Sequence, residues 1–168
     1  MLITPTVLYE ASYKEYIKEL GNEERYPYPL DLDHSNFASF VNLLNGYSKG
    51  VNLPENLVPN TTFWLIENSE IVGCSHLRHC LNDALRFAGG HIGLGIRPSK
   101  RGQGYGMKLL NLTLEKAFEI GVDEVHIHCY KSNKVSSSLI ASSGAKLDSI
   151  VETQGKNEQV LRFVHSRC

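Results

Sequence analysis

The feature of this sequence that most constrains its fold is a glycine-rich junction between a strand pattern and a helix pattern. The apolar run that begins at His91 stops at Pro98, and a helical period begins near Gly104. Gly102, Gly104 and Gly106 occupy alternate positions in and after the junction. Glycine leaves backbone N–H groups uncovered, and the following helix directs the positive end of its dipole to the same point. The junction therefore predicts an anion site built largely from main chain.

Basic side chains surround this junction, namely Arg97, Lys100 and Arg101. Backbone donors and flexible basic arms together suit a diphosphate. A P-loop would require Gly-Lys-Ser/Thr, but Gly106 is followed by Met107. A dinucleotide-binding fold would carry GxGxxG after the first strand of a parallel sheet, whereas this junction reads GxGxG and follows an antiparallel hairpin. Both nucleotide-binding alternatives are disfavoured, and a glycine-rich turn without a ligand remains the structural alternative.

Hydropathy periodicity gives the rest of the chain an α+β order, with no internal repeat and no linker between domains. Helical periods cover residues 7–20, 33–47, 104–121 and 133–143, with Asp33 or Ser35 placed to cap the second helix. Strand patterns cover residues 61–66, 70–77, 91–97, 125–130, 146–151 and 159–164, the last two forming a hairpin around residues 154–156. This order predicts a mixed, mostly antiparallel sheet flanked by helices, with a parallel crossover only near residues 91–130.

Bulk properties exclude several functional classes. A chain of 168 residues, 42% hydrophobic and 21% charged, predicts one domain over residues 1–168. Its 17 basic and 18 acidic side chains give a net charge of -1, so neither nucleic acid nor a membrane surface is expected as a partner. The chain lacks an apolar run of about 18 residues and a signal-peptide pattern, so we expect a cytoplasmic protein.

The spacing of cysteine and histidine residues can indicate a metal site or a disulfide. Cys74, Cys80, Cys129 and Cys168 lack CxxC spacing and are predicted to be free thiols. Two groups invite a metal interpretation: His76, His79 and Cys80, and separately His126, His128 and Cys129. Residues two apart share a strand face, but a third and fourth ligand are not evident, so no metal is predicted.

The junction resembles the acetyl-coenzyme A (acetyl-CoA) motif of the GNAT superfamily of N-acetyltransferases. That motif runs Arg/Gln-x-x-Gly-x-Gly/Ala between a strand and a helix, and Arg101, Gly104 and Gly106 fill it in register. Segments that look like a bacterial subgroup of predicted acetyltransferases are residues 61–65, 77–82 and 90–99. The resemblance covers roughly residues 55–165 and is strongest across residues 90–120.

The resemblance implies a GNAT fold, with six to seven strands in a sheet that splits between the fourth and fifth strands. It implies that an acetyl group moves from acetyl-CoA, a co-substrate, to a primary amine of a small-molecule or peptide acceptor by direct attack in a ternary complex. Residues 1–88 would lie mainly on the acceptor side, where Tyr26 and Tyr28 are candidate pocket walls, and residues 89–168 mainly on the acetyl-CoA side. A homodimer stays open, and the acceptor is not identified.

The resemblance also implies a division of labour along acetyl-CoA. The diphosphate would lie on Arg101, Gly102, Gln103, Gly104, Tyr105, Gly106 and Met107. The pantetheine arm would lie along the preceding strand like an added strand, with main-chain hydrogen bonds from Leu94, Gly95 and Ile96, whose N–H groups would also hold the oxyanion. Gly93 and Gly95 suit a bulge that splays this strand from residues 125–130 and admits the thioester.

One expected catalytic group is missing. The resemblance places Asn133 against the pantetheine arm, but seven residues later, where the family often has a tyrosine that protonates the leaving thiolate, this chain has Ile140. Ser136 and Ser137 share a helical face with Asn133, and Tyr130 ends the neighbouring strand, so any of these or water could replace it. Ile140 also motivates a second hypothesis, a non-catalytic module that binds or senses CoA.

His91 is the first candidate for the general base. An amine with a pKa of about 10 must lose a proton before it attacks, and an imidazole with a pKa of about 6.5 could accept that proton directly or through water. Other GNAT members often place a glutamate on this strand, but Glu67 and Glu70 lie at the hairpin turn. The alternative is a histidine whose ring is satisfied by backbone at a strand end.

Overall fold

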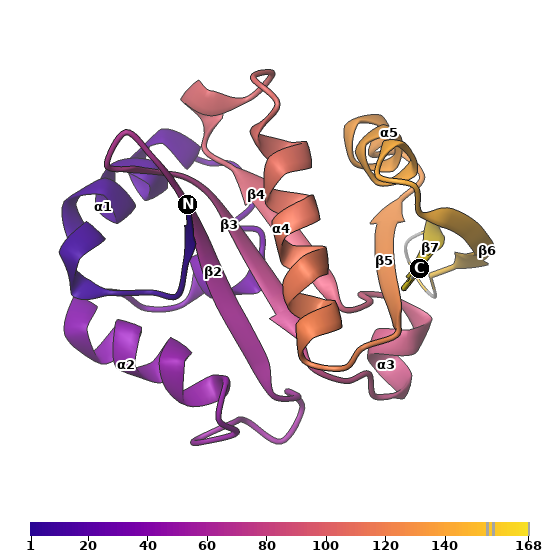
Figure 1. Cartoon of the computed structure of the whole chain (residues 1–168), viewed down its shortest axis with the longest axis horizontal. Helices are drawn as coiled ribbons and strands as arrows, with labels where there is room; N and C mark the ends of the chain where they lie inside the picture. The colour runs from indigo at the N-terminus through magenta and orange to yellow at the C-terminus, as the bar shows by residue number, and fades with distance from the viewer. Residues whose placement is uncertain (154, 156, 168) are drawn as a thin grey trace.

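The computed structural model describes residues 1–153, 155 and 157–167 of the chain. The predicted turn around residues 154–156 and the predicted free thiol of Cys168 lie partly or wholly outside this description. The remaining elements fall close to the expected ranges. They form two antiparallel sheets with helices on their faces (Figure 1).

The first sheet has four strands in the order β1 (Leu2–Ile3), β2 (Asn60–Glu67), β3 (Glu70–Arg78) and β4 (Ile92–Ile96). Asn68 and Ser69 turn the β2–β3 hairpin with φ of 49° and 63°, the left-handed values that two-residue hairpin turns use. Sequence periodicity missed β1, because two residues cannot display an alternation.

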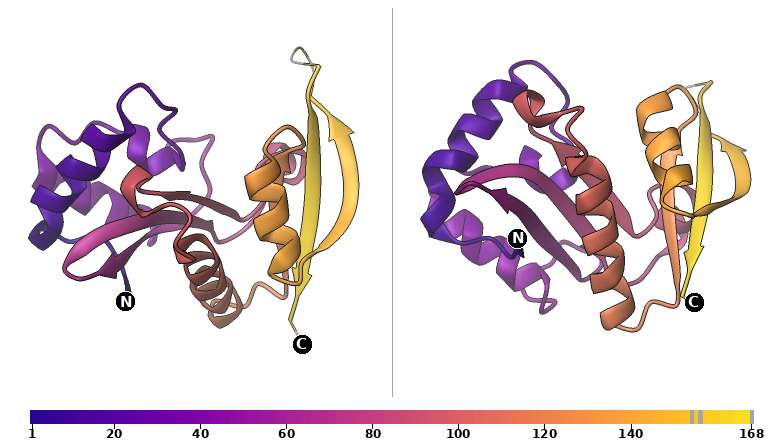
Figure 2. Two further views of the ribbon diagram at one scale, coloured as in Figure 1. Left: turned by 90° about the horizontal axis from the view of Figure 1, so that it is seen from above. Right: turned by 45° about the horizontal axis from the view of Figure 1, so that its top comes forward.

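Helices α1 (Glu10–Leu20) and α2 (Phe37–Tyr47) cover one face of this sheet, and α4 (Tyr105–Glu119) covers the opposite face (Figure 2). The aromatic side chains Tyr13, Phe37, Phe40 and Trp64 pack under α1 and α2. The predicted cap of α2 was wrong. Asn36 is the N-cap and accepts a hydrogen bond from Ser39 N at 3.0 Å, while the Asp33 carboxylate accepts from Ser35 N and closes a local turn.

The second sheet has three strands in the order β5 (Glu124–Tyr130), β7 (Gln159–Ser166) and β6 (Lys146–Glu152). Helix α5 (Lys134–Ser142) packs against β5, and the short helix α3 (Asp83–Phe87) precedes β4. The two sheets share a hydrophobic core that includes Phe63 of β2, Leu110 and Leu114 of α4, Val125 of β5 and Phe163 of β7. Packing around α4 therefore holds the two sheets together.

The predicted α+β fold, divided after the fourth strand, is confirmed. Strands β4 and β5 are linked at one end by an isolated bridge between Gly90 and Ile127 and by a 2.7 Å hydrogen bond from His91 N to His126 O. Beyond that point the sheets stand apart (Figure 2). The strand-helix-strand unit of β4, α4 and β5 is present, but its two strands form no parallel ladder in the described chain.

The split does not depend on the bulge expected at Gly93 and Gly95. The β3–β4 register is unbroken through both residues, so that expectation was wrong. Both glycines instead admit the loop after α1. A Cβ atom on Gly93 would lie 2.6 Å from the Tyr26 hydroxyl oxygen, and one on Gly95 would collide with the Tyr26 carbonyl oxygen. These glycines allow the loop to lie directly on the sheet.

Candidate active site

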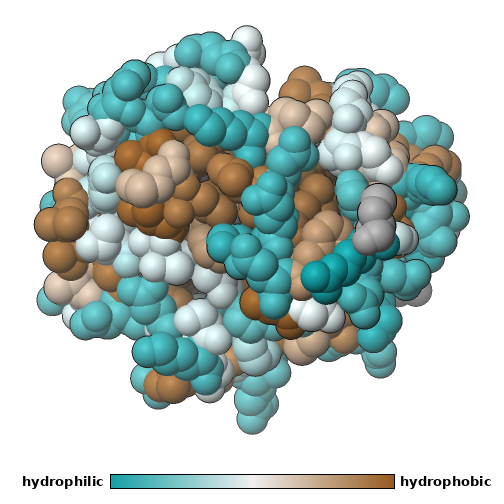
Figure 3. Space-filling view, in the orientation of Figure 1, coloured by the Kyte–Doolittle hydropathy of each residue, from teal (hydrophilic) through white to brown (hydrophobic). Residues whose placement is uncertain are grey.

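A cleft of about 600 Å³ occupies the split between the two sheets. Its walls come from the end of α1 and the loop after it, from β4, from β5 and from α5. In the space-filling view, a notch between the loop before α4 and helix α5 marks where the surface is hollowed toward this region (Figure 3). The predicted site residues that line the cleft are Leu94, Gly95, Ile96, Arg101, Tyr130, Asn133 and Ser136.

One wall of the cleft is the open edge of β4. Arg97 N donates to Val72 O at 3.0 Å, and His91 O accepts from Arg78 N at 2.8 Å, so alternate residues of β4 bond to β3. By this alternation Gly95 directs its N–H and C=O to β3, while Leu94 and Ile96 direct theirs into the split. The open edge can therefore bond to an extended ligand through two of the three residues that the sequence analysis named.

The N-terminus of α4 lies next to this edge and is bare. Gly102 and Gly104 have φ of 72° and 82°, and a Cβ atom on either would meet nothing within 4 Å. Within the described residues, no N–H of residues 102–107 donates a hydrogen bond to another protein group. Because these amides point outward from the positive end of a 15-residue helix, the segment fits a diphosphate.

Gly106 has a different role from the other two glycines. A Cβ atom there would lie 3.4 Å from the Leu139 side chain and 3.9 Å from Ile96. The first turn of α4 therefore packs closely on α5 and on the end of β4. This packing fixes the bare amides relative to the cleft.

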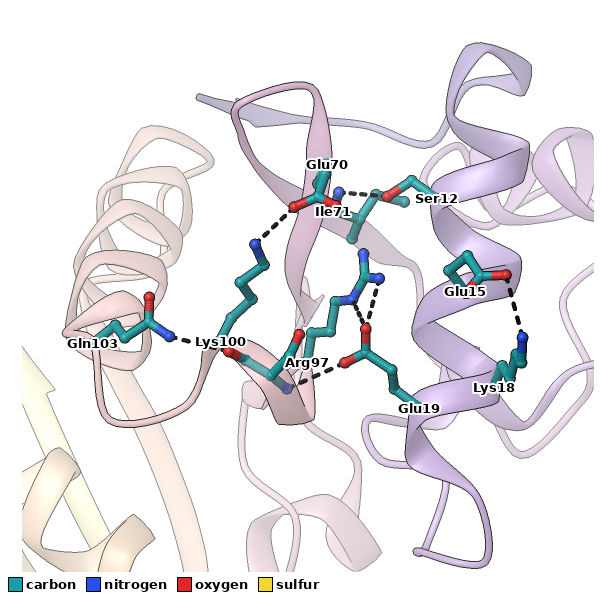
Figure 4. A network of polar contacts seen from close by, with 10 residues as sticks. Ser12, Glu15, Lys18, Glu19, Glu70, Ile71, Arg97, Lys100 and Gln103 are labelled. Atoms are coloured by element: carbon teal, nitrogen blue, oxygen red, sulfur yellow. Dashed lines mark hydrogen bonds and ion pairs between the residues drawn. The ribbon is translucent and has the colours of Figure 1, made fainter.

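Two of the three basic side chains expected at the anion site form ion pairs with other parts of the fold. The Arg97 side chain, 7% exposed, forms a 2.6 Å ion pair with Glu19 of α1, and Lys100 forms a 2.7 Å pair with Glu70 (Figure 4). Glu19 also accepts from Ser99 N, and the Arg97 hydrogen bond lowers the pKa of Glu19 to about 2. The expectation that Arg97 and Lys100 add free charge around the anion was wrong, because both are paired with carboxylates of α1 and β3. They anchor the loop to α1 and to the β2–β3 hairpin.

Arg101 is the basic side chain that reaches the cleft. Its Nε donates to Ile96 O at 3.0 Å, and its two terminal nitrogens donate to the Glu23 carboxylate at 3.2 and 2.7 Å. The hydrogen bond from Arg101 lowers the pKa of Glu23. Gln103 is tied to the loop by a 3.0 Å hydrogen bond from its amide to Ser99 O. Arg101 thus caps the open edge of β4 and stands between the phosphate loop and the acidic residues after α1.

Tyr26 lines the cleft and lies against β4. Its hydroxyl points at the strand beside Gly93, as the close approach there shows, and burial of that hydroxyl raises the pKa of Tyr26. Tyr26 lines the cleft, as predicted for a pocket wall, whereas Tyr28 packs near the His76 ring. The signal for Tyr26 was present in the sequence as the two glycines of β4, which mark a close backbone approach as readily as a bulge.

Two histidines lie at the closed end of the split. His91 is 6% exposed, its Nδ1 accepts from His126 N at 3.0 Å, and it does not line the cleft. His128 does line the cleft, and its Nδ1 accepts from Gly89 N at 3.1 Å. Burial lowers the pKa of each histidine to about 4, so both are neutral at pH 7.

Helix α5 contributes its first turn to the opposite wall. Asn133 caps the helix by accepting from Ser136 N at 3.0 Å, and both residues line the cleft. The Ser137 hydroxyl donates to Lys134 O at 3.1 Å and lies outside the lining. Ile140 is buried in the wall at the position where the resemblance expects a tyrosine.

Over residues 1–153, 155 and 157–167, no group of three or more His, Cys, Asp or Glu side chains could hold a metal ion. No helix in that part of the chain has the length and hydrophobicity needed to cross a membrane. Cys74, Cys80 and Cys129 are free cysteines, and burial raises the pKa of the Cys129 thiol beside the cleft.

Solved structures share this architecture. An acetyltransferase from Salmonella typhimurium that modifies the N-terminal serine of ribosomal protein L7/L12 superposes with a TM-score of 0.72 at 12% identity, over 99% of this chain and 94% of that one. Spermidine N-acetyltransferase from Vibrio cholerae gives 0.66 at 16% identity, over 99% and 94%. A Salmonella typhimurium protein solved with its cofactor acetyl-CoA gives 0.64 at 14% identity, over 99% and 92%.

Sequence comparison agrees with the fold. Curated protein sequences give no match. The family model described as the acetyltransferase (GNAT) family matches residues 31–144, which include the open strand, the phosphate loop, α4, β5 and α5. With its split sheet and its bare helix N-terminus, this chain belongs to the GNAT family of acetyltransferases.

Proposed function

We propose that this protein transfers an acetyl group from acetyl-CoA to a primary amine by direct attack in a ternary complex within the split. The observation that carries this proposal is that the bare amides of residues 102–107 lie next to the open edge of β4, which lines the cleft, with Gly106 packed near Ile96. Acetyl-CoA supplies the acyl thioester. The chain supplies a binding path and a site closed to bulk water at one end.

The two ends of this path hold different parts of acetyl-CoA in the proposal. The amides of Gly102, Gln103, Gly104, Tyr105, Gly106 and Met107, together with Arg101, bind the diphosphate. Leu94 and Ile96 offer main-chain hydrogen bonds to the pantetheine arm, while Gly95 bonds to β3 and admits the Tyr26 loop. Asn133 and Ser136 form the opposite wall. Segment 1–88 then faces the acceptor through α1 and the loop that carries Glu23, Glu24 and Tyr26.

Tyr26 is the proton donor that the structure favours for the leaving thiolate. Its hydroxyl lies against β4 inside the cleft, and its raised pKa keeps it protonated across the neutral range. The amine nitrogen bonds to the carbonyl carbon, the C–S bond breaks, and the sulfur takes the Tyr26 proton, which solvent replaces. Tyr130 lines the same cleft and is the alternative donor, whereas the Ser137 hydroxyl already donates to Lys134 O.

His91 is disfavoured as the base by its placement. Its Nδ1 is already an acceptor for His126 N, and its pKa of about 4 leaves little affinity for a proton at pH 7. The proton of the acceptor ammonium therefore leaves to water at the cleft mouth, and His91 holds the closed end of the split together. His91→Gln, which keeps an acceptor, is expected to leave the pH profile of kcat/KM unchanged.

The experiment for this function has two stages. Calorimetry should show acetyl-CoA binding at micromolar concentrations, and the absence of detectable binding at high micromolar protein would end the proposal. Thiol release should then be followed with polyamines, amino sugars and peptides, since similar folds include a spermidine acetyltransferase and a ribosomal-protein acetyltransferase. Tight binding without thiol release on any amine would favour the second candidate, a CoA-binding or sensing module, which Ile140 motivates.

A further inference from the structure

The closed end of the split contains a buried donor that the roles above do not use. His128 is 7% exposed, and it lines the cleft between Ile127 and Cys129. Its Nδ1 accepts the 3.1 Å hydrogen bond from Gly89 N. In the part of the chain that the structure describes, its Nε2 has no hydrogen-bond partner.

The bond from Gly89 fixes the chemical form of the ring. A ring nitrogen that accepts from a backbone N–H cannot itself carry hydrogen, so in the neutral imidazole the proton is on Nε2. The lowered pKa of His128 keeps the ring neutral at pH 7. His128 is therefore a donor with a fixed tautomer, and no described protein group accepts its Nε2–H, which leaves this donor available to a ligand.

Backbone packing also fixes where the ring lies. A Cβ atom on Gly90 would stand 3.3 Å from Cδ2 of His128 and closer still to His126 O. The ring consequently rests on the Gly89–Gly90 segment where β4 and β5 are still bridged. This is the closed end of the path that begins at the phosphate loop.

The charges near His128 select the kind of acceptor. The charged and titratable side chains that act on it are Arg78, Arg162, His91 and His126, with no carboxylate among them. A basic environment disfavours an ammonium and favours an oxygen that carries negative charge. A donor N–H likewise cannot bind the protons of an amine. Of the reacting groups, the thioester carbonyl oxygen suits this surrounding best, because an ammonium is disfavoured near Arg78 and Arg162.

We propose that the Nε2–H of His128 donates a hydrogen bond to the thioester carbonyl oxygen of acetyl-CoA and to the oxyanion formed from it. This inference rests on the proposed function. When the amine nitrogen bonds to the carbonyl carbon, the electron pair of the C=O bond moves to that oxygen, and it returns as the C–S bond breaks. His128 stabilises the charged oxygen and keeps its own proton throughout.

The decisive measurement is the ratio of two affinities. Acetyl-CoA and CoA share the diphosphate and the pantetheine arm, but the thioester carbonyl is present in acetyl-CoA alone. By calorimetry, His128→Phe should weaken acetyl-CoA about three- to tenfold, the worth of one hydrogen bond, and leave CoA unchanged. His128→Gln, which keeps an N–H donor, should restore part of the ratio.

His126→Phe is the matched control, since His126 is on the same face of β5 and outside the cleft lining. It should leave both affinities unchanged. Equal losses for CoA and acetyl-CoA in His128→Phe would mean a structural role and would overturn the inference. Failure of the unsubstituted protein to bind CoA at all would instead remove the proposed function.

A second readout needs no substitution. In ¹⁵N-labelled protein, the Nε2–H signal of His128 should shift when acetyl-CoA is added and shift much less with CoA. Identical shifts for the two ligands would count against a bond to the thioester carbonyl. If His128→Phe fails to fold, this measurement still decides the proposal.

Discussion

The two ends of the cleft are built on opposite plans. At the phosphate end, the side-chain charges are neutralised in pairs, Arg97 with Glu19 and Arg101 with Glu23, while the backbone amides stay bare. At the closed end, the rings of His91 and His128 accept from backbone donors, and Nε2 of His128 has no hydrogen-bond partner among the described residues. One end offers main chain to a ligand, and the other offers a side chain.

This difference separates anchoring from chemistry. A diphosphate is held well by several fixed amides, which keep their place because the neighbouring basic side chains are tied to α1 and to the hairpin (Figure 4). A developing oxyanion needs one donor at one point, and a ring clamped by Gly89 supplies it. Substitutions of the residues that anchor the loop should therefore impair the phosphate end. At the closed end, substitution of a single side chain should be enough.

The largest effect is expected from Glu19→Gln, which tests whether the phosphate loop depends on its support. Arg97 would keep its buried charge but lose its partly exposed carboxylate partner, and leaving a buried charge unpaired costs about 3 kcal/mol of unfolding free energy. Urea unfolding measures the loss. Glu15→Gln is the control, because the Glu15–Lys18 pair on the same helix is exposed and 3.9 Å long. Equal, small changes in both variants would contradict a supporting role for Glu19.

The next largest effect is expected on CoA binding. It is tested at two glycines with similar backbone conformation. Gly104 and Gly121 flank α4 with φ of 82° and 89°, and a Cβ atom on either meets nothing within 4 Å. Valine should strain the two positions similarly. Gly104→Val should weaken CoA about 100-fold, as expected for the loss of one or two charge-assisted hydrogen bonds, whereas Gly121→Val should not.

Calorimetry of the two glycine variants, with thermal unfolding as a check on folding, measures both effects. Similar melting temperatures with different CoA affinities would confirm an anion site at Gly104. Similar affinities would mean that the glycines serve only the geometry of the helix ends.

The sequence predicted the phosphate end well because that end is local. Residues 101–107 are contiguous, and the start of a helix fixes their amides, so glycine spacing alone indicated the site. Arg97 was misjudged, because its partner Glu19 lies 78 residues away along the chain. The predicted strand and helix ranges were confirmed to within a few residues, whereas β1 and α3 were not predicted, because each is too short to show a period.

The closed end could not be predicted in the same way. The partner of His128 is Gly89, 39 residues earlier, and Tyr26 meets Gly93 from the loop after α1. Such contacts depend on how the two sheets and the loop come together, so the glycines of β4 could mark a close approach but not name the residue that makes it. His91 was therefore predicted as the general base, although its Nδ1 already accepts a hydrogen bond. His128 was considered only as a metal ligand, and that interpretation was rejected.

A third prediction concerns acid stability, and it tests whether the buried histidines are neutral. Burial lowers the pKa of His76 to about 3 and those of His91 and His128 to about 4, against an unfolded value of about 6.5. Between pH 6.5 and 4 the unfolded chain binds more protons than the folded chain, so stability falls as pH falls. Each of the three rings should lower the unfolding free energy by about 2 kcal/mol from pH 7 to pH 5.

Urea titrations at pH 7, 6 and 5 follow this loss. The Glu19 carboxylate, with a pKa of about 2, titrates below this window and does not contribute to it. His91→Gln removes one of the three titrating rings and should flatten the slope. A slope that stays the same in His91→Gln, or a stability independent of pH, would show that these rings are protonated in the folded protein.

The smallest effect is expected from Glu23→Gln. This substitution tests whether the Arg101–Glu23 ion pair competes with binding of the diphosphate. Arg101 cannot bind Glu23 through both terminal nitrogens and a diphosphate with the same donors, so the carboxylate competes with the ligand. Removing the negative charge should tighten CoA about threefold at low salt, the scale of an exposed ion pair, and the gain should shrink as salt rises. Calorimetry at two ionic strengths measures it.

The control for this competition is Glu24→Gln. Glu24 lines the same cleft and carries the same charge, but over the described residues Arg101 pairs only with Glu23. Repulsion of CoA by general negative potential would give both variants the same gain, whereas release of Arg101 would give it to Glu23→Gln alone. In the second case, CoA binding frees an acidic side chain at the mouth of the cleft, where an amine must enter. The ion pair would then couple the two substrates, because the arrival of the diphosphate prepares the charge that attracts the acceptor.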